Sequence, residues 1–240
     1  MNSPKFIWVT RSAPDNLVSS HHLRATGHNP LIAPVLAIRP LVHPTELHPP
    51  DALIFTSCHG VRHHHFDGRF TNVPVFAIGQ RTAMTAVDAG YRTVHSADGN
   101  VSELQALMHA RLAPGAEIIH FSAAEPASDL PRALNDRGLS VRQITVYESD
   151  ETPLENLGPA LAALPWIDGI LVHSPKAGAR IAGFVADCGT YWRGKIFCIS
   201  EASAAPLRQV TRQPIIVARA PNERALLTLI DRDPGQWATI

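Results

Sequence analysis

Polar and basic side chains follow the apolar runs of this sequence, at the points where turns from strand to helix are expected. Ser, Thr, Gly, Arg or Lys occur in each of five such segments, at residues 9–12, 56–60, 79–82, 173–176 and 200–203. At the start of a helix the backbone N–H groups lack partners within the helix, and the helix dipole favours anions. One such segment by itself is commonly an ordinary helix cap. Five of them together predict a site that binds several carboxylates or phosphates.

Cysteine and histidine also occur in arrangements that could act as nucleophiles or bind a metal. Cys58 lies next to His59, but adjacent residues rarely form the hydrogen bond from base to nucleophile, and no orienting Asp or Asn is evident. The run at 63–65 and the pair at 21–22 are consecutive histidines, which point in different directions on a helix and share a metal poorly. We therefore interpret the histidine runs as polar helix faces and predict no metal site. No G-x-G-x-x-G or Walker pattern supports nucleotide binding.

Short apolar runs alternate with segments of helical spacing along the whole chain. Strands are expected at 6–9, 31–38 (interrupted by Pro34), 53–56, 75–78, 118–121, 141–147, 169–172, 196–199 and 215–217. Helices are expected at 15–25, 82–89, 102–111 (with a cap in 98–100), 127–137, 154–163, 175–186, 202–210 and 222–231. This alternation predicts parallel sheets with helices on both faces, in which ligands bind beyond the carboxyl ends of the strands.

The two halves of the sequence resemble one another. Residues 51–57 match 168–174, and residues 75–79 match 196–200. Residues 6–9 followed by Gly27 match residues 117–120 followed by Gly138. Because the matches keep one order in both halves, we expect a duplication that gives two small α/β domains.

Composition narrows the class of protein. The 240 residues carry 21 Lys and Arg and 21 Asp and Glu, so the formal net charge is zero, which argues against a protein held mainly by nonspecific attraction to nucleic acid or membrane. A hydrophobic content of 45% and a charged content of 18% are typical of a globular chain. The three cysteines have no CxxC spacing, and no secretory signal or membrane-length apolar run is evident, so a cytoplasmic location with reduced thiols is expected.

The same segments carry a family resemblance that spans nearly the whole chain. Residues 51–57 with Gly60 and Val61 resemble the D-x-(apolar)-F-T-S-x-N-G-V signature of uroporphyrinogen-III synthases. Residues 75–79 with Thr82, Ala83 and Gly90 resemble the T-A segment of that family, and Val9, Thr10 and Arg11 resemble its opening T-R-P. The order and spacing of these motifs favour membership of the family.

The resemblance implies a fold of two similar parallel-sheet, flavodoxin-like α/β domains, joined by a two-stranded linker with the active site in the cleft between them. Applied to this sequence, it places a discontinuous domain at 1–37 plus 150–240 and an inserted domain at 41–146. The linkers are expected near 38–40 and 147–149.

The resemblance also implies a reaction. Members of the family are lyases that cyclise the linear tetrapyrrole hydroxymethylbilane to uroporphyrinogen III, with inversion of ring D, loss of water, and no metal or cofactor. Because this substrate carries many carboxylates, the site needs many hydrogen-bond donors. The candidate ligands are Thr10, Arg11, Ser57, Arg81, Thr82, Ser174, Lys176, Ser200 and Ser203.

Tyr147 matches a tyrosine that recurs in the family, and it is the candidate acid or water-orienting group for the departing hydroxyl. An aromatic residue that packs at a strand end is the alternative role for Tyr147. The partner expected is the substrate, with no nucleic acid and no membrane. We expect a monomer that contacts hydroxymethylbilane synthase transiently.

The sequence departs from the family pattern in three places. Ser12 replaces a proline, Cys58 and His59 replace a pair that more often holds proline or asparagine, and residues 122–128 lack the usual Gly and Arg before Asp129. The altered segment 122–128 and the pair Cys58 and His59 keep open a noncatalytic tetrapyrrole- or anion-binding regulatory module of the same fold. A periplasmic-type solute binder is disfavoured by the absence of a signal peptide.

Overall fold

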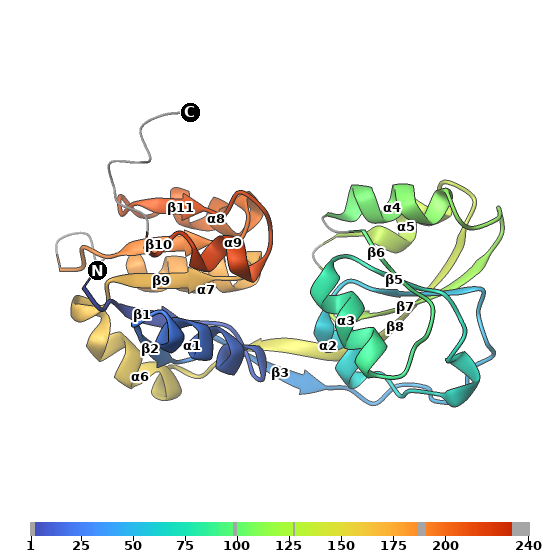
Figure 1. The fold of residues 1–240 in the computed structure, drawn as a ribbon, viewed down its shortest axis with the longest axis horizontal. Coiled ribbons are helices and arrows are strands. Elements are labelled where there is room, and N and C mark those ends of the chain that lie inside the picture. The colour runs from blue at the N-terminus through green and yellow to red at the C-terminus, as the bar shows by residue number, and fades with distance from the viewer. Residues whose placement is uncertain (1–2, 98–99, 127, 187–190, 232–240) are drawn as a thin grey trace. The chain divides into compact units, whose positions relative to one another are not determined.

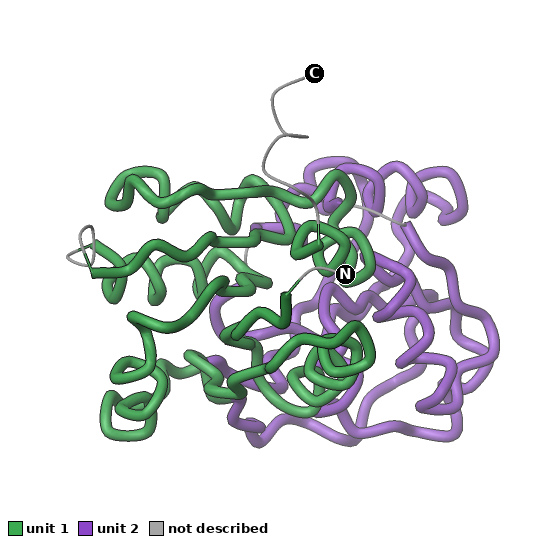
Figure 2. The backbone as a smooth tube through the Cα atoms, turned by 60° about the vertical axis from the view of Figure 1, so that its left-hand side comes forward, with its two compact units in different colours: residues 1–37, 150–240 green, residues 38–149 purple. Residues whose placement is uncertain are grey.

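The computed structural model of the chain divides into two compact units (Figure 2). Unit 1 contains residues 1–37 and 150–240, and unit 2 contains residues 38–149. The structure describes residues 3–97, 100–126, 128–186 and 191–231.

The strands of unit 1 are short and almost wholly apolar, as in sheets that are covered on both faces. They are β1 (Phe6–Val9), β2 (Asn29–Ile32), β9 (Gly169–Val172), β10 (Lys195–Cys198) and β11 (Ile215–Val217). All pairings are parallel, and the order across the sheet is β11-β10-β9-β1-β2. The direction of winding reverses between β9 and β1, which is where parallel α/β sheets bind ligands at their carboxyl ends.

Helices cover both faces of the unit 1 sheet (Figure 1). They are α1 (Asp15–Ala25), α6 (Leu154–Ala163), α7 (Pro175–Val185), α8 (Glu201–Arg208) and α9 (Glu223–Leu227), with a 3-10 turn, η2, at Leu164–Trp166. Trp8 and Ile170 face a core that includes Leu157 of α6 and Ile181 of α7. The opposite face of the sheet packs against α1 and α9 through residues such as Leu226.

Unit 2 has a second sheet of the same kind. Its strands are β3 (Leu36–Pro40), β4 (Ala52–Phe55), β5 (Val75–Ala77), β6 (Val94–Ser96), β7 (Glu117–Ala123) and β8 (Ser140–Glu151). Their order is β3-β8-β7-β4-β5-β6, and the pairs from β8 through β6 are parallel. In this sheet the winding reverses between β4 and β7.

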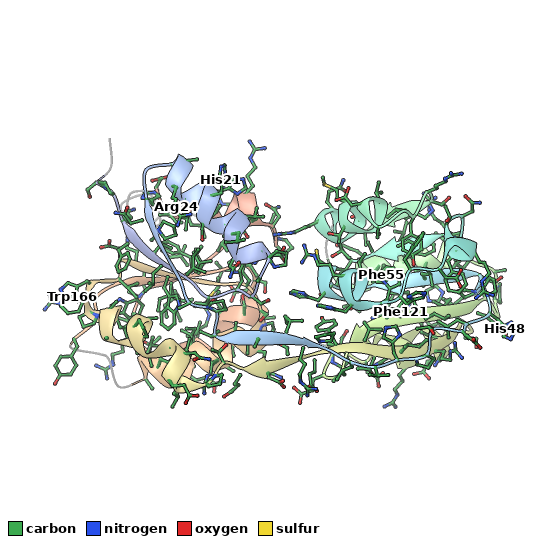
Figure 3. The ribbon with its side chains drawn as sticks, turned by 90° about the horizontal axis from the view of Figure 1, so that it is seen from below. His21, Arg24, His48, Phe55, Phe121 and Trp166 are labelled. Carbon is green, nitrogen blue, oxygen red and sulfur yellow. The ribbon has the colours of Figure 1, made fainter. Side chains whose placement is uncertain are left out.

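The helices of unit 2 also lie on both faces of their sheet. They are α2 (Cys58–His63), α3 (Gln80–Asp88), α4 (Val101–His109) and α5 (Leu130–Asn135), with a 3-10 turn, η1, at Gly68–Phe70. One core contains Phe55 and Phe121, whose rings stack with centroids 5.6 Å apart (Figure 3). The core on the other face contains Leu104 of α4 and Leu134 of α5.

The chain passes between the units twice, within β3 and β8. These strands are neighbours in the sheet and run in opposite directions, because the N–H of Leu41 donates to Val146 while the N–H of Thr152 donates to Val35. Residues 38–40 and 147–149, which the sequence analysis assigned to linkers, are grouped with unit 2.

The internal repeat has structural counterparts in the two units. Asp168 accepts a hydrogen bond from the backbone N–H of Phe6 at 2.7 Å, and Asp51 accepts one from that of Glu117 at 2.8 Å. Each aspartate precedes one central strand and holds the start of the other. Gly27 and Gly138, the glycines matched in the sequence, have φ angles of +84° and +85°.

The predicted class, α/β with two parallel sheets, is confirmed, and several predicted elements need correction. The strand expected at 31–38 is divided around Pro34 into β2 and β3, and the strand expected at 141–147 continues to Glu151. The helix expected at 127–137 is shorter, because Asp129 caps it and Pro131 lies in its first turn; residue 127 lies outside the described part. Of the cap expected in 98–100, Asn100 caps α4, whereas 98 and 99 are outside the described residues.

Within the described residues, no helix is both long and apolar enough to cross a membrane.

Candidate functional site

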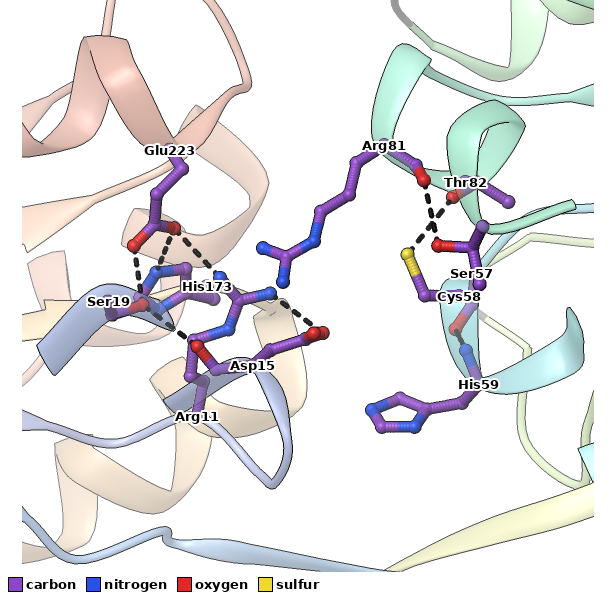
Figure 4. Close-up of polar contacts among 11 residues, drawn as sticks. Arg11, Asp15, Ser19, Ser57, Cys58, His59, Arg81, Thr82, His173 and Glu223 are labelled. Carbon is purple, nitrogen blue, oxygen red and sulfur yellow. Dashed lines mark hydrogen bonds and ion pairs between the residues drawn. The ribbon is translucent and has the colours of Figure 1, made fainter. Parts of the chain in front are cut away.

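The carboxyl ends of β1 and β9 bring a charged cluster together in unit 1 (Figure 4). Arg11 follows β1, His173 follows β9, and Glu223 is the first residue of α9. Glu223 accepts hydrogen bonds from Nη1 of Arg11 at 2.8 Å and from Oγ of Ser19 at 2.5 Å, and it lies 2.9 Å from Nε2 of His173. Asp15 pairs with Nη2 of Arg11 at 3.1 Å. These five residues are called the Arg11 cluster below.

The carboxylate of Glu223 is ionised despite its burial. Its side chain is 15% exposed, and burial alone would raise its pKa. The hydrogen bond and charge of His173, the charge of Arg11 and the hydroxyl of Ser19 together lower the pKa of Glu223 to about 2. Glu223 is not among the residues predicted from the sequence; its only local signal is a position directly after the cap residue Asn222.

The other predicted ligands in unit 1 mostly organise loops and helix starts. Thr10 is buried, and its hydroxyl donates to the carbonyl of Leu171 in β9 at 2.5 Å. Ser174 caps α7 by accepting from the N–H of Ala177 at 3.1 Å. Ser200 and the fully buried Ser203 form a capping box on α8.

Lys176 is the second residue of α7 and is partly exposed.

In unit 2, Tyr147 lies within β8 at the last position paired with β7, close to Ser57, which follows β4, and to His59 and His63 of α2. Ser57 caps α2 by accepting from the N–H of His59 at 3.0 Å, and its side chain interacts with the phenol of Tyr147. The ring of Tyr147 lies 5.6 Å from that of His59 and 6.0 Å from that of His63, measured between centroids. The two imidazoles are stacked, with an interplanar angle of 11°.

Tyr147 is buried, with 8% of its surface exposed. Burial raises the pKa of its phenol above the ordinary value, and the charge of Cys58 acts in the same direction, while the hydrogen bond with Ser57 opposes them. The phenol is therefore protonated at neutral pH and available as a hydrogen-bond donor.

The remaining predicted ligands of unit 2 lie in the first turn of α3. Thr82 is buried, with its hydroxyl 3.7 Å from the sulfur of Cys58. Arg81, the residue before it, is partly exposed. The predicted set is thus divided between the units, with Ser57, Arg81, Thr82 and Tyr147 in unit 2 and the other six in unit 1.

The histidines of the run at 63–65 do not form one polar helix face. His64 is buried, and its ring lies 2.7 Å from the hydroxyl of Tyr91 and 2.6 Å from the carbonyl of Val61. His63 ends α2, and His65 is exposed. The interpretation fails for His64 because the chain leaves the helix there and turns the ring into the core. In the described part of the chain, no group of three or more His, Cys, Asp or Glu side chains is arranged to hold a metal.

A second buried histidine lies where the winding of the unit 2 sheet reverses. His120 of β7 is 1% exposed, and its Nε2 lies 3.2 Å from the hydroxyl of Thr56, which follows β4. Its Nδ1 is buried without a hydrogen-bond partner. Burial lowers the pKa of His120 to about 4, so the ring is neutral.

The fold and the sites therefore place the chain among proteins built from two parallel-sheet α/β units, each with polar side chains near the carboxyl ends of its central strands. The family model described as uroporphyrinogen-III synthase HemD matches residues 18–228. The chain therefore belongs to the uroporphyrinogen-III synthase family, which confirms the resemblance found in its sequence. Its reaction is that of a cyclising hydro-lyase, the conversion of hydroxymethylbilane to uroporphyrinogen III with inversion of ring D and loss of water.

Solved structures agree with this assignment at the level of the fold. Uroporphyrinogen-III synthetase from Helicobacter pylori is 20% identical over 95% of this chain and 98% of that chain, with a TM-score of 0.62. A mutant uroporphyrinogen III synthase from Thermus thermophilus is 16% identical over 95% and 98% of the two chains, with a TM-score of 0.58. A comparison with curated proteins gave no match.

Proposed function

We propose that Tyr147 assists the loss of water from hydroxymethylbilane by donating a hydrogen bond to the departing hydroxyl. The observation that carries this proposal is the buried position of Tyr147 in β8, where its ring lies beside those of His59 and His63 and its phenol interacts with Ser57, the residue that caps α2. Ser57 is itself fixed as the cap of α2, so the position of the phenol is defined by the fold. A defined donor stabilises charge that develops on the leaving oxygen.

The raised pKa of Tyr147 supports a hydrogen-bond donor that orients the hydroxyl over an acid that gives up its proton. A phenol whose pKa is raised above its ordinary value releases its proton reluctantly at neutral pH. Complete proton transfer from Tyr147 would therefore be costly, whereas a hydrogen bond from its O–H costs no ionisation. We infer that Tyr147 orients and polarises the hydroxyl. The C–O bond breaks, the N–H of the pyrrole that carries the hydroxymethyl group supplies the proton that completes the departing water, and an azafulvene remains. Water exclusion and ring positioning supply the rest of the acceleration.

Each unit offers loop residues that would bind carboxylates of the substrate. Arg11, Arg81 and Lys176 supply charged donors, and the starts of α3, α7 and α8 supply backbone N–H groups. The predicted hydroxyl ligands would act chiefly by holding these loops, because their hydroxyls already contact other groups of the protein. They are Thr10, Ser57, Thr82, Ser174, Ser200 and Ser203.

The test compares Tyr147→Phe with the unaltered chain on freshly made hydroxymethylbilane. The ratio of isomer III to isomer I in the product is measured, because isomer I forms spontaneously. We expect the unaltered chain to give isomer III and Tyr147→Phe to give it about tenfold more slowly, the effect of losing one hydrogen bond worth about 1.4 kcal/mol. A full rate in Tyr147→Phe would remove this residue from the mechanism. Only isomer I from the unaltered chain would favour the noncatalytic module.

We also propose that the protein works as a cytoplasmic monomer in transient contact with hydroxymethylbilane synthase. The two described cysteines, Cys58 and Cys198, are free thiols, which suits a reducing compartment. Transient contact is supported by the chemistry of the substrate, which closes spontaneously to the wrong isomer when it is released. Sedimentation of the protein alone and with the synthase would test the monomeric state and the contact.

A further inference from the structure

Glu223 is the centre of the Arg11 cluster. Its Oε2 contacts both Arg11 and His173, and its Oε1 accepts from Ser19. The three partners come from the loop after β1, from the loop after β9 and from α1 (Figure 4). One carboxylate therefore joins the segments that surround the reversal point of the unit 1 sheet.

The backbone position of Glu223 is itself fixed. The side chain of Asn222 caps α9 by accepting from the N–H of Ala225 at 2.9 Å, and Leu226 anchors the helix in the core with no exposed surface. A carboxylate held in this way can impose an orientation on the groups that bind it. Arg11 is held from two directions, because Asp15 binds its other terminal nitrogen.

The net charge of the Arg11 cluster does not attract an anionic ligand. The carboxylates of Asp15 and Glu223 outweigh Arg11 when His173 is neutral, and they balance Arg11 and His173 when the imidazole is protonated. A carboxylate near the ligands of a polycarboxylate substrate repels that substrate. Attraction of the substrate therefore cannot be what Glu223 contributes, whereas a fixed orientation of Arg11 and His173 can be.

We propose that Glu223 is a positioning residue for the cyclisation: it orients Arg11 and His173 so that a substrate carboxylate is bound in one geometry. The proposal rests on the proposed role of Arg11 as a substrate ligand. A fixed guanidinium loses less conformational entropy when it binds a carboxylate, and it restricts how the bound chain can lie. Because ring D must invert before the macrocycle closes, a loosely held substrate closes without inversion and gives isomer I.

Glu223→Gln separates orientation from attraction. The amide keeps the size of the side chain and removes its charge, so Arg11 and His173 lose their common anchor while the local potential becomes more positive. We expect KM for hydroxymethylbilane to stay the same or fall, kcat to fall about tenfold, and the share of isomer I in the enzyme-dependent product to rise. Unchanged kcat and isomer ratio would overturn the proposal, as would a rise in KM with both of these unchanged.

Glu155→Gln is the matched control. Glu155 lies in the first turn of α6, as Glu223 lies in that of α9, but it is exposed, and the start of α6 is not among the proposed substrate ligands. We expect wild-type kinetics and a wild-type isomer ratio from this variant. Thermal unfolding of both variants and active-site titration correct for any loss of folded protein. A fall in kcat of Glu223→Gln that vanishes after this correction would assign Glu223 a purely structural role and overturn the proposal.

Arg11→Lys, alone and combined with Glu223→Gln, supplies a second test. Lysine keeps the charge but lacks the planar fork that Glu223 and Asp15 hold. We expect kcat of the double variant with Glu223→Gln to fall by less than the product of the two single-variant factors, because both changes disrupt the same Arg11–Glu223 interaction. Multiplicative losses would contradict the proposal. If the unaltered chain made only isomer I, the proposed function itself would fail, which is a distinct outcome.

Discussion

Burial determines the protonation state of two histidines in unit 2. His64 and His120 are 8% and 1% exposed, and desolvation lowers the pKa of each from 6.5 to about 4. For His64, nearby His43 and His65 act in the same direction, whereas hydrogen bonds to backbone groups oppose the change. Both rings are therefore neutral in the folded protein at neutral pH, whereas the same histidines in the unfolded chain take up protons below about pH 6.5.

This difference predicts that unit 2 loses stability in mild acid. Because the folded-state pKa is lower than the unfolded value, the unfolded chain binds protons first, and the free energy of unfolding falls as the pH drops from 6.5 towards 4. Each buried histidine contributes a loss of about 2 kcal/mol by near pH 5. In His120→Leu we expect this loss to shrink by about the contribution of one histidine, measured by urea unfolding near pH 7 and near pH 5.

His21→Gln is the control for this measurement, because His21 is exposed on α1 and its removal should leave the pH dependence unchanged. His120→Leu also removes the buried Nδ1 that has no partner, so its stability near pH 7 should not fall by the amount typical of a lost core residue. A pH dependence equal to that of the unaltered chain would show that His120 is not buried as described.

Elements with clear boundary signals could be predicted closely from the sequence. The helices at Asp15–Ala25 and Leu154–Ala163 and the strand at Gly169–Val172 have the predicted bounds. The apolar runs and the helical periodicity that predict these elements lie within the elements themselves, so the local sequence is enough to predict their bounds. The helix α2 was not assigned bounds, because six residues are too few for a periodic pattern to appear.

The length of β8 depends on interactions that the local sequence does not contain. Its polar end at 148–151 is extended because β3 pairs alongside it, as the hydrogen bond from Thr152 to Val35 shows. The Arg11 cluster has the same origin, since Glu223 is 212 positions from Arg11 in the chain. Sequence reasoning found the residues of the loops after the strands, whereas the partners that orient them come from distant segments.

The packing of α7 against α8 gives a prediction at the scale of elements. A Cβ at Gly178 would lie closer than 3.0 Å to the carbonyl oxygen of Ser203, a backbone atom of α8. Gly178→Ala must therefore push the helices apart, and we expect a loss of about 1–3 kcal/mol or more in the free energy of unfolding. Urea unfolding measures this change directly.

Gly183→Ala is the matched control in the same helix. No atom lies within 4 Å of the added Cβ, and Gly183 is exposed. Alanine is the better helix former, so we expect this variant to gain up to about 1 kcal/mol. Equal effects of the two substitutions would mean that helix propensity alone sets the change in the free energy of unfolding, and that the close approach of α7 and α8 does not affect it.

At the scale of the whole molecule, the two units share one arrangement of strands, but the chain begins to build it at a different strand in each unit. In unit 2 the chain builds β4, β5 and β6 before β7 and β8, and the order across these strands is β8-β7-β4-β5-β6. In unit 1 the strands β9, β10 and β11 occupy the places of β4, β5 and β6, while β1 and β2 occupy those of β7 and β8. Unit 1 is therefore completed by the first segment of the chain, and unit 2 is contiguous.

This difference predicts that the units depend differently on the rest of the chain. A fragment of residues 38–149 contains all of unit 2, whereas a fragment of residues 150–240 lacks β1 and β2. β1 lies between β9 and β2, and its Ile7, Trp8 and Val9 have no exposed surface. Burying each of these side chains contributes about 1.5–3 kcal/mol, so their loss is comparable with the whole stability of a domain, about 5–15 kcal/mol.

We therefore expect fragment 38–149 to unfold cooperatively on heating, and fragment 150–240 to show no cooperative transition by circular dichroism. Adding a peptide of residues 1–37 should restore a transition in fragment 150–240, because the peptide supplies the strand between β9 and the edge of the sheet. A peptide in which Trp8 is replaced by Asp is the control and should restore nothing, since this side chain enters the core beside Ile170. Cooperative unfolding of fragment 150–240 alone would contradict the dependence on β1, and absence of a transition in fragment 38–149 would contradict the independence of unit 2.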